Sequence, residues 1–173
     1  MNPVMKTENT YVLPCNKKDI QVAVSDPRAH FDYLKHAVDF ALPEGSKILA
    51  AQDGEVVKLR QHSDEGGLDD KYKGAPEYIN RIVIAHENGE YSEYGHLQHQ
   101  GARVEKGDRV KQGQVIGLSG NTGYSSRPHL HFHVLHKIDE EPGWETLAIC
   151  WKNTPDIEAK QKQDGRTVQH YSF

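Results

Sequence analysis

The chain has 173 residues, 36% of them hydrophobic, and a formal net charge of −4 at neutral pH. A length of this order predicts one domain. The acidic balance, without any run of lysine and arginine, argues against a nucleic-acid or anionic-membrane surface, and no segment reaches the ~20 apolar residues of a membrane span.

Short apolar runs separated by turn residues predict β-structure through the middle of the chain. Two pairs of runs each flank a hairpin signal, Asp53-Gly54 between 47–51 and 55–59, and Asn88-Gly89 between 81–85 and 90–94. Shorter strands are predicted at 115–118, 130–135 and 147–151. Strands of this length and spacing indicate an all-β fold, an antiparallel sandwich or barrel-sandwich hybrid with long loops.

The flanking segments and one long loop are less regular. Thr154-Pro155 could begin a helix that runs to Gly165, but Ile157 and Ala159 are its only apolar positions, so we expect a short helical or frayed tail. The Ser63–Tyr78 loop is long for a compact domain, which is typical of functional or mobile loops. We therefore predict an N-terminal strand or extension at 1–24, a core domain at 25–151 and a tail at 152–173.

The segment Pro128-His129-Leu130-His131-Phe132-His133 places a histidine at every second position. Side chains of a strand alternate between its two faces, so the three histidines share one face and the apolar residues between them share the other. Burying three imidazoles is costly unless something uses their ring nitrogens. A metal ion is the commonest user.

Two further segments offer residues of the same chemistry. His30, His36 and Asp39 lie within 29–43, and His96 lies in the segment 91–97. A catalytic zinc ion takes three protein ligands and keeps one position open for water. One aspartate, one histidine before it and one histidine of the 129–133 strand could hold the ion. His96 and a second strand histidine would remain for proton transfer and oxyanion stabilisation.

The chain resembles the LytM/lysostaphin-type zinc metallopeptidases, which cut peptide bonds of bacterial peptidoglycan. The resemblance covers about 29–135 and rests on five segments in the family's order: His-Ala-Val-Asp-Phe-Ala-Leu-Pro-Glu-Gly at 36–45, Ala-Ala-Gln-Asp-Gly-Glu-Val-Val at 50–57, Tyr-Gly-His-Leu at 94–97, Val-Lys-Gln-Gly-Gln-Val-Ile-Gly at 110–117, and Ser-Gly-Asn-Thr-Gly-Tyr-Ser at 119–125 followed by Pro-His-Leu-His-Phe at 128–132. It implies the duplicated hybrid motif fold, a metallopeptidase domain at 25–151 and one zinc ion per chain.

The resemblance also implies roles for individual residues. Asp39 and His131 match zinc ligands, whereas His96 and His129 match the two catalytic imidazoles. Positions two apart on one face of a strand lie about 6.5–7 Å apart, so one ring can bind zinc while its neighbour faces the water or the scissile carbonyl. His133 stands where the family often has a carboxylate or amide, and we expect it beside the metal site.

The first zinc ligand departs from the family pattern. The family usually places a histidine four residues before the aspartate, and this chain has Lys35 there. A protonated lysine has no lone pair to give to a metal. His36 or His30 could replace it. Strand parity favours His30, provided that the residues from Phe31 to Lys35 loop out.

Three functions remain open on the sequence. The first is a zinc endopeptidase acting on a peptidoglycan peptide or another short peptide, as a monomer without a nucleic-acid partner. The second, motivated by Lys35, is a catalytically degenerate binding or activator module. The third is a phosphocarrier, because the run at 104–117 also resembles the glucose-type IIA domains. Residues 1–19 contain no apolar leader, so we expect the bacterial cell envelope if a leader has been removed, and otherwise the cytoplasm.

Overall fold

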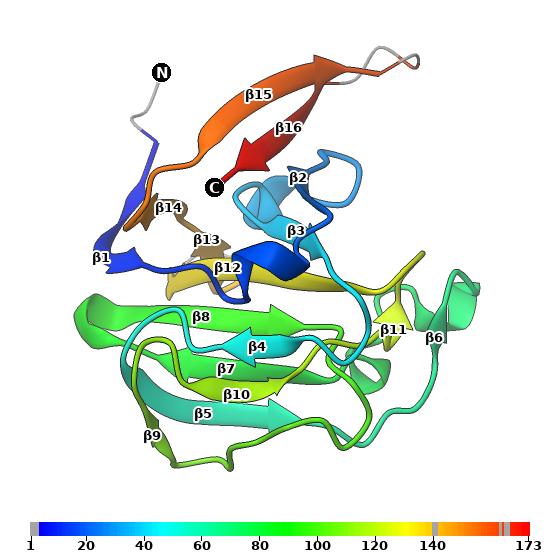
Figure 1. Cartoon of the computed structure of the whole chain (residues 1–173), viewed down its shortest axis with the longest axis vertical. Helices are drawn as coiled ribbons and strands as arrows, with labels where there is room; N and C mark the ends of the chain where they lie inside the picture. The colour runs from blue at the N-terminus through cyan, green and yellow to red at the C-terminus, as the bar shows by residue number, and fades with distance from the viewer. Residues whose placement is uncertain (1–3, 140–141, 163, 165–166) are drawn as a thin grey trace.

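A computed structural model describes residues 4–139, 142–162, 164 and 167–173. Its main feature is one large antiparallel sheet (Figure 1). The strand order along this sheet is β15 (Asp156–Gln161), β16 (Thr167–Ser172), β2 (Val22–Ser25), β3 (Val38–Ala41), β12 (His129–Lys137), β8 (Glu90–Gly95), β7 (Arg81–Ala85), β5 (Gly54–Arg60) and β9 (Arg109–Val110), with β13 (Trp144–Thr146) paired to β12. The described residues contain 3₁₀ turns but no α-helix, which confirms the all-β prediction.

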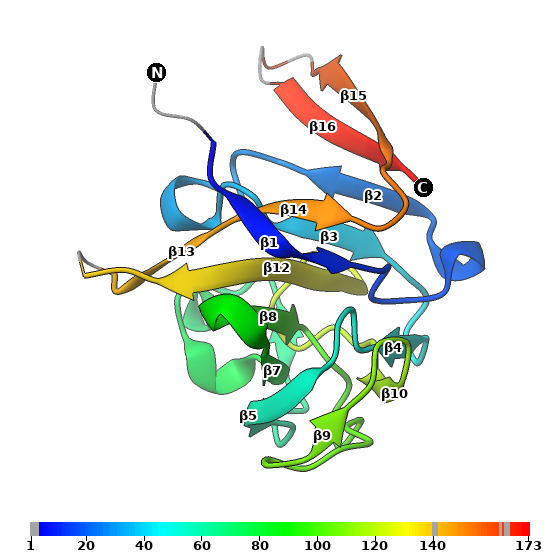
Figure 2. The ribbon, with the colours of Figure 1, turned by 90° about the vertical axis from the view of Figure 1, so that its left-hand side faces the viewer.

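Three two-stranded pairs complete the fold. They are β4 (Lys47–Leu49) with β10 (Val115–Leu118), β1 (Lys6–Tyr11) with β14 (Ala148–Trp151), and β6 (Gly66–Gly67) with β11 (Gly123–Tyr124). Figures 1 and 2 show β4 and β10 as a separate layer against β5, β7 and β8. The fully buried core includes Ile48, Val56, Ile82, Ile84, Tyr94, Ile116, Leu130 and Phe132.

The histidine strand lies at the centre of this sheet. Leu130, Phe132 and Val134 of β12 are completely buried in the core, as the predicted alternation requires. On the opposite face, β12 pairs with β3 so that His131 lies opposite Asp39. The register of two strands distant in sequence therefore puts a carboxylate beside an imidazole.

One predicted hairpin is confirmed and the other is wrong. Asn88 and Gly89 have φ angles of 60° and 71° and connect β7 to β8, as an Asn-Gly turn between paired strands should. The strands around Asp53-Gly54 do not pair, because β4 joins β10 whereas β5 joins β7 and β9. The Asp53 carboxylate instead accepts a hydrogen bond from the backbone N–H of Gln112, so it ties two distant turns together.

The prediction of a short helical or frayed C-terminal tail is wrong. The tail forms the hairpin β15–β16. The spacing of two between Ile157 and Ala159 is that of a strand, and β16 pairs with β2 at the edge of the large sheet. The ring of Phe173 packs against Phe40 and Trp151, with ring centroids 5.8 Å and 5.1 Å apart, respectively. The predicted helix end at Gly165 lies outside the described residues. The predicted domain boundaries remain predictions. The N-terminal segment pairs with the core strands β14 and β3, and the C-terminal hairpin pairs with β2, most of which lies within 1–24.

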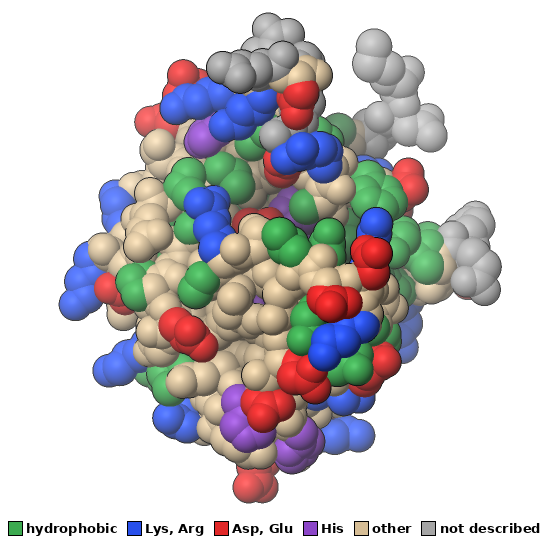
Figure 3. All heavy atoms as spheres, turned by 90° about the vertical axis from the view of Figure 1, so that its right-hand side faces the viewer, with side chains coloured by type: hydrophobic (Ala, Val, Ile, Leu, Met, Phe, Trp, Pro, Cys, Tyr) green, Lys and Arg blue, Asp and Glu red, His purple; other side chains and the backbone are tan. Residues whose placement is uncertain are grey.

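Figure 3 shows one face of the molecule, on which basic side chains are scattered among acidic and hydrophobic ones. Across the described part of the chain, no helix has the length and apolar character needed to cross a membrane.

Candidate metal centre and active site

Three donor atoms converge on one point on one face of the strand pair β3–β12. Nε2 of His30 lies 3.2 Å from Oδ1 of Asp39, and Nδ1 of His131 lies 3.0 Å from the same oxygen. The donor atoms of the three residues all lie within 4.8 Å of one another. Two ligands held about 2.0–2.1 Å from a tetrahedral zinc ion are about 3.3 Å apart, so the donor set and its spacing fit this metal.

The loop after β2 brings His30 to this point. The backbone N–H of His30 donates to the carbonyl of Asp26 at 2.8 Å, and its Nδ1 lies 3.3 Å from Oγ of Ser25. The side chain is buried, with a relative exposure of 4% for the residue. The chain then makes the 3₁₀ turn η2 (Asp32–Leu34) before it enters β3. The residues between His30 and Asp39 thus leave the sheet and return to it.

The Asp39 carboxylate supplies the negative charge that a bound cation requires. Burial opposes ionisation of Asp39, but hydrogen bonds and charge from His131 and His30 outweigh burial and hold the pKa of this carboxyl well below its usual range. Burial likewise acts to lower the pKa of His131, but the hydrogen bond to Asp39 together with the charges of Asp39 and Glu93 outweighs burial and raises it. Asp39 is therefore a carboxylate at neutral pH, the form that binds metals.

Two more imidazoles border the donor atoms. Nδ1 of His129 bonds the carbonyl of Arg127 at 2.8 Å, and Nδ1 of His96 bonds the carbonyl of Thr122 at 2.6 Å. A carbonyl only accepts hydrogen bonds, so each ring carries its proton on Nδ1 and keeps the lone pair of Nε2 free when it is neutral. Nε2 of His129 lies 3.7 Å from Oδ1 of Asp39. The two ring centroids are 4.5 Å apart.

Burial keeps both of these rings neutral. It lowers the pKa of His96 to about 3, with smaller contributions from His129 and His131, and it also lowers the pKa of His129. His96 has a φ angle of 60°, in the left-handed region that residues other than glycine rarely adopt. Such strained residues cluster at functional sites, which agrees with the role expected of His96.

A strap of chain at 119–127 orients both rings through its carbonyls. The hydroxyl of Thr122 donates to the carbonyl of Leu97 at 2.9 Å, and the hydroxyl of Ser125 lies 2.8 Å from the carbonyl of Arg127. The amide oxygen of Asn121 accepts from the Ser125 hydroxyl, so Asn121 stabilises the turn. Sequence reasoning did not assign Ser25, Thr122 or Ser125 to the site, and only the position of Ser125 four residues before His129 hints at its contact.

The alternative ligands lie elsewhere. Lys35 Nζ is 3.6 Å from Glu145 Oε2, and the Lys35 side chain is 54% exposed. The backbone N–H of His36 donates to the hydroxyl of Thr146, and His36 is not among the residues whose donor atoms converge. Both residues face β13. Of the two histidines considered for the first ligand position, the structure brings only His30 to Asp39.

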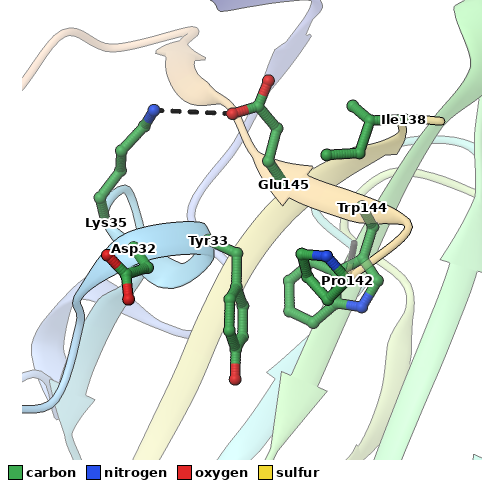
Figure 4. Close-up of a pocket in the computed structure, with 7 residues that line it drawn as sticks. All are labelled: Asp32, Tyr33, Lys35, Ile138, Pro142, Trp144 and Glu145. Carbon is green, nitrogen blue, oxygen red and sulfur yellow. Dashed lines mark ion pairs between the residues drawn. The ribbon is translucent and has the colours of Figure 1, made fainter. Parts of the chain in front are cut away.

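An open pocket of about 780 Å³ lies between η2 and β13. Figure 4 shows Lys35 and Glu145 paired across it, with the rings of Tyr33 and Trp144 below them. These two rings meet edge to face with centroids 4.9 Å apart. Trp144 also stacks on His133, with centroids 5.7 Å apart and planes 5° from parallel. The pocket is thereby connected to the histidine face of β12.

This all-β scaffold with a His/Asp/His donor set and two flanking imidazoles defines a candidate mononuclear metallohydrolase site. The chain belongs to the Peptidase family M23, whose family model matches residues 33–142. The matched range contains Asp39, His96, His129 and His131, and it begins three residues after His30.

Relatives of known name agree with this assignment. The chain is 38% identical over 100 residues to the peptidoglycan DD-endopeptidase ShyA of Vibrio cholerae, covering 58% of this chain and 20% of that protein. It is also 38% identical over 98 residues to the glycyl-glycine endopeptidase ALE-1 of Staphylococcus capitis, covering 56% of this chain and 23% of that one. The chain therefore spans about a fifth of the length of these two relatives.

A solved structure resembles the fold as well. The crystal structure of a zinc containing peptidase from Vibrio cholerae superimposes with a TM-score of 0.54 at 31% identity. The match covers 73% of this chain and 37% of that one.

Proposed function

We propose that this chain is a zinc-dependent endopeptidase that hydrolyses peptide bonds of bacterial peptidoglycan. The convergence of His30 Nε2, Asp39 Oδ1 and His131 Nδ1 carries this proposal. These three residues would hold one zinc ion per chain. The names of the two relatives, a peptidoglycan DD-endopeptidase and a glycyl-glycine endopeptidase, support peptidoglycan as the substrate class.

The bound ion would supply a water molecule whose pKa is lowered from 15.7 to about 7, and it would polarise the scissile carbonyl. Nε2 of His129 lies within 4 Å of the Asp39 carboxylate, and its lone pair is available to take a proton from water. The Arg127 carbonyl keeps the His129 ring oriented for this transfer. Once protonated, the same nitrogen can give its proton to the leaving amine.

His96 is the second imidazole of the site. Its Nδ1 is held by the Thr122 carbonyl, so Nε2 is the nitrogen left to meet the substrate. Burial favours the neutral form of this ring. A neutral ring can accept a hydrogen bond at Nε2 and so orient water or the substrate amide, which a permanently charged ring could not do.

Metal analysis combined with digestion of purified peptidoglycan tests the proposal. We expect one zinc ion per wild-type chain and the release of new amino termini from peptidoglycan. Asp39→Ala and His131→Ala should lose both zinc and cleavage. His96→Ala and His129→Ala should keep zinc and lose cleavage. A wild-type chain that takes up no zinc on reconstitution, or that binds zinc and leaves peptidoglycan intact, would contradict the proposal.

A non-catalytic binding module has less support. Its motivation was a lysine at the expected ligand position, and Lys35 is paired with Glu145 away from the donor atoms. With His30 beside Asp39, the chain still offers three ligands.

A further inference from the structure

His133 lies next to the candidate metal centre without belonging to the set of converging donor atoms. It follows His131 by two positions in β12 and is almost completely buried, with 2% exposure. Its Nδ1 lies 3.1 Å from Nε2 of His131. Since the other nitrogen of His131 faces Asp39 at 3.0 Å, the His131 ring lies between the two residues.

The proton positions on these two rings are coupled. A histidine that binds a metal through Nδ1 has its single remaining proton on Nε2. In His131 that N–H points at Nδ1 of His133, and two nitrogens at hydrogen-bond distance need one donor and one acceptor. His133 must then accept, with its own proton on Nε2.

Trp144 fixes the plane of the His133 ring. The two rings are parallel within 5°, and Trp144 in turn contacts Tyr33 at the side of the open pocket (Figure 4). Among the described residues, Nε2 of His133 has no hydrogen-bond partner. Leaving a buried ring nitrogen unpaired costs stability, which a phenyl ring at this position would avoid. The reason for an imidazole at this position must therefore lie in its other nitrogen, Nδ1, which faces His131.

We propose that His133 is a positioning residue for the metal centre. Its Nδ1 accepts the hydrogen bond of His131 Nε2–H and so directs Nδ1 of His131 toward Asp39 and the metal. The inference rests on the metal centre of the proposed function, and it requires neither proteolytic activity nor any particular substrate. Partners of this kind commonly change metal affinity 10–100-fold when they are removed.

Two substitutions separate positioning from packing. His133→Phe keeps a ring on Trp144 and removes the acceptor. His133→Asn loses the stacked ring and keeps an oxygen acceptor close to the position of Nδ1. His136→Phe, on the same strand and in contact with Glu145, is the matched control. For each full-length protein we would measure the zinc dissociation constant by competition with a chromogenic chelator, and the melting temperature without metal.

We expect His133→Phe to weaken zinc binding by about 10–100-fold with little change in melting temperature. His133→Asn should melt earlier and bind zinc within a few-fold of the wild type, and His136→Phe should bind like the wild type. Nitrogen-15 spectra of the zinc-loaded wild type should show the His131 proton on Nε2.

Zinc binding by His133→Phe at wild-type strength, or affinities that follow the melting temperatures, would overturn the assignment. A wild-type protein that binds no zinc would overturn the metal centre together with it. If zinc binds and responds to His133 as expected while peptidoglycan stays intact, the proposed substrate fails and the positioning role stands.

Discussion

Oδ1 of Asp39 lies 3.0 Å from Nδ1 of His131, although 92 positions separate the two residues in sequence. They face each other across the antiparallel pair β3–β12, where opposite residues present their side chains on the same face. Two of the three members of the donor set are thus fixed by sheet register, which a buried core holds in place. His30, by contrast, lies in a loop and not in a strand of the sheet, so register does not fix its position. Its role as a ligand is therefore the first to test.

The first prediction concerns the identity of this third ligand. His30→Ala should weaken zinc binding by more than the 10–100-fold that is typical of losing a partner outside the ligand set. His36→Ala should bind zinc as the wild type does, because its backbone contacts Thr146 and its ring is not among the converging donors. Chelator competition on the two variants decides the matter, and the reverse ranking would assign His36 as the ligand.

The second prediction concerns the contact between the Ser63–Tyr78 loop and the strap. A Cβ atom on Gly66 would lie 2.0 Å from the carbonyl oxygen of Asn121. Because this oxygen belongs to the backbone, the clash can be relieved only by a shift of the main chain. Gly66→Ala should therefore lower the free energy of unfolding by about 1–3 kcal/mol.

Gly117→Ala is the control for this substitution, because the nearest atoms to its Cβ are at 3.5 Å and its φ angle is not in the left-handed region. In Gly117→Ala the added methyl group reduces the conformational entropy of the unfolded chain. The free energy of unfolding should therefore stay unchanged or rise by up to about 1 kcal/mol. Urea denaturation measures both. Equal stability of the two variants would mean that the loop does not press on the strap.

The third prediction concerns the two free thiols. Cys15 is 2% exposed, and burial with the nearby charge of Asp19 raises its pKa to about 12. Cys150 is partly exposed. Because the thiolate is the reactive form, a disulfide reagent such as DTNB should modify one thiol in the native protein and two in denaturant. Cys150→Ser should abolish the native reaction and Cys15→Ser should leave it. Two thiols reacting at equal rates in the native state would refute this.

The fourth prediction concerns pH and His86, which lies far from the metal site in sequence. Its Nδ1 bonds the carbonyl of Asp53 and its Nε2 the hydroxyl of Ser92, both at 2.7 Å. Burial lowers the pKa of His86, and the bonds to Asp53 and the charge of Glu90 only partly oppose this. Below the unfolded pKa of about 6.5, the unfolded chain takes up a proton that the folded ring excludes, so this contribution to stability is present above that pH and lost below it.

His86→Gln should accordingly be less stable than the wild type by about 1 kcal/mol near pH 8, through weakened hydrogen bonds. The difference should shrink as the pH falls below about 6.5. Denaturation curves at several pH values test this, with His99→Gln at an exposed position as the control. A difference independent of pH would show that His86 is protonated equally in both states.

The strands that could be predicted were those marked by an apolar run between turn residues. The predicted runs at 81–85, 90–94 and 130–135 agree with β7, β8 and β12 to within two residues at each end. Partner choice could not be predicted, because it depends on residues far along the chain: β4 pairs with β10 and not with β5. The C-terminal hairpin was missed for a similar reason, since β16 completes the edge offered by β2.

The site could be predicted only in part. Asp39 and His131 stand in recognisable motifs, and the structure places them together. The contact of Ser25 with His30 and the stacking of Trp144 on His133 join segments whose sequences carry no sign of each other. The roles assigned to these residues remain predictions until metal binding is measured.

The excursion through η2 has a consequence for how related chains are classified. His30 and Asp39 are nine positions apart and still meet at 3.2 Å, because the intervening residues leave the sheet and come back. A pattern search that demands a histidine four positions before the aspartate would label this chain a pseudoenzyme. Homologues that carry a lysine at that position therefore need their upstream loop traced for a displaced histidine before they are set aside as inactive.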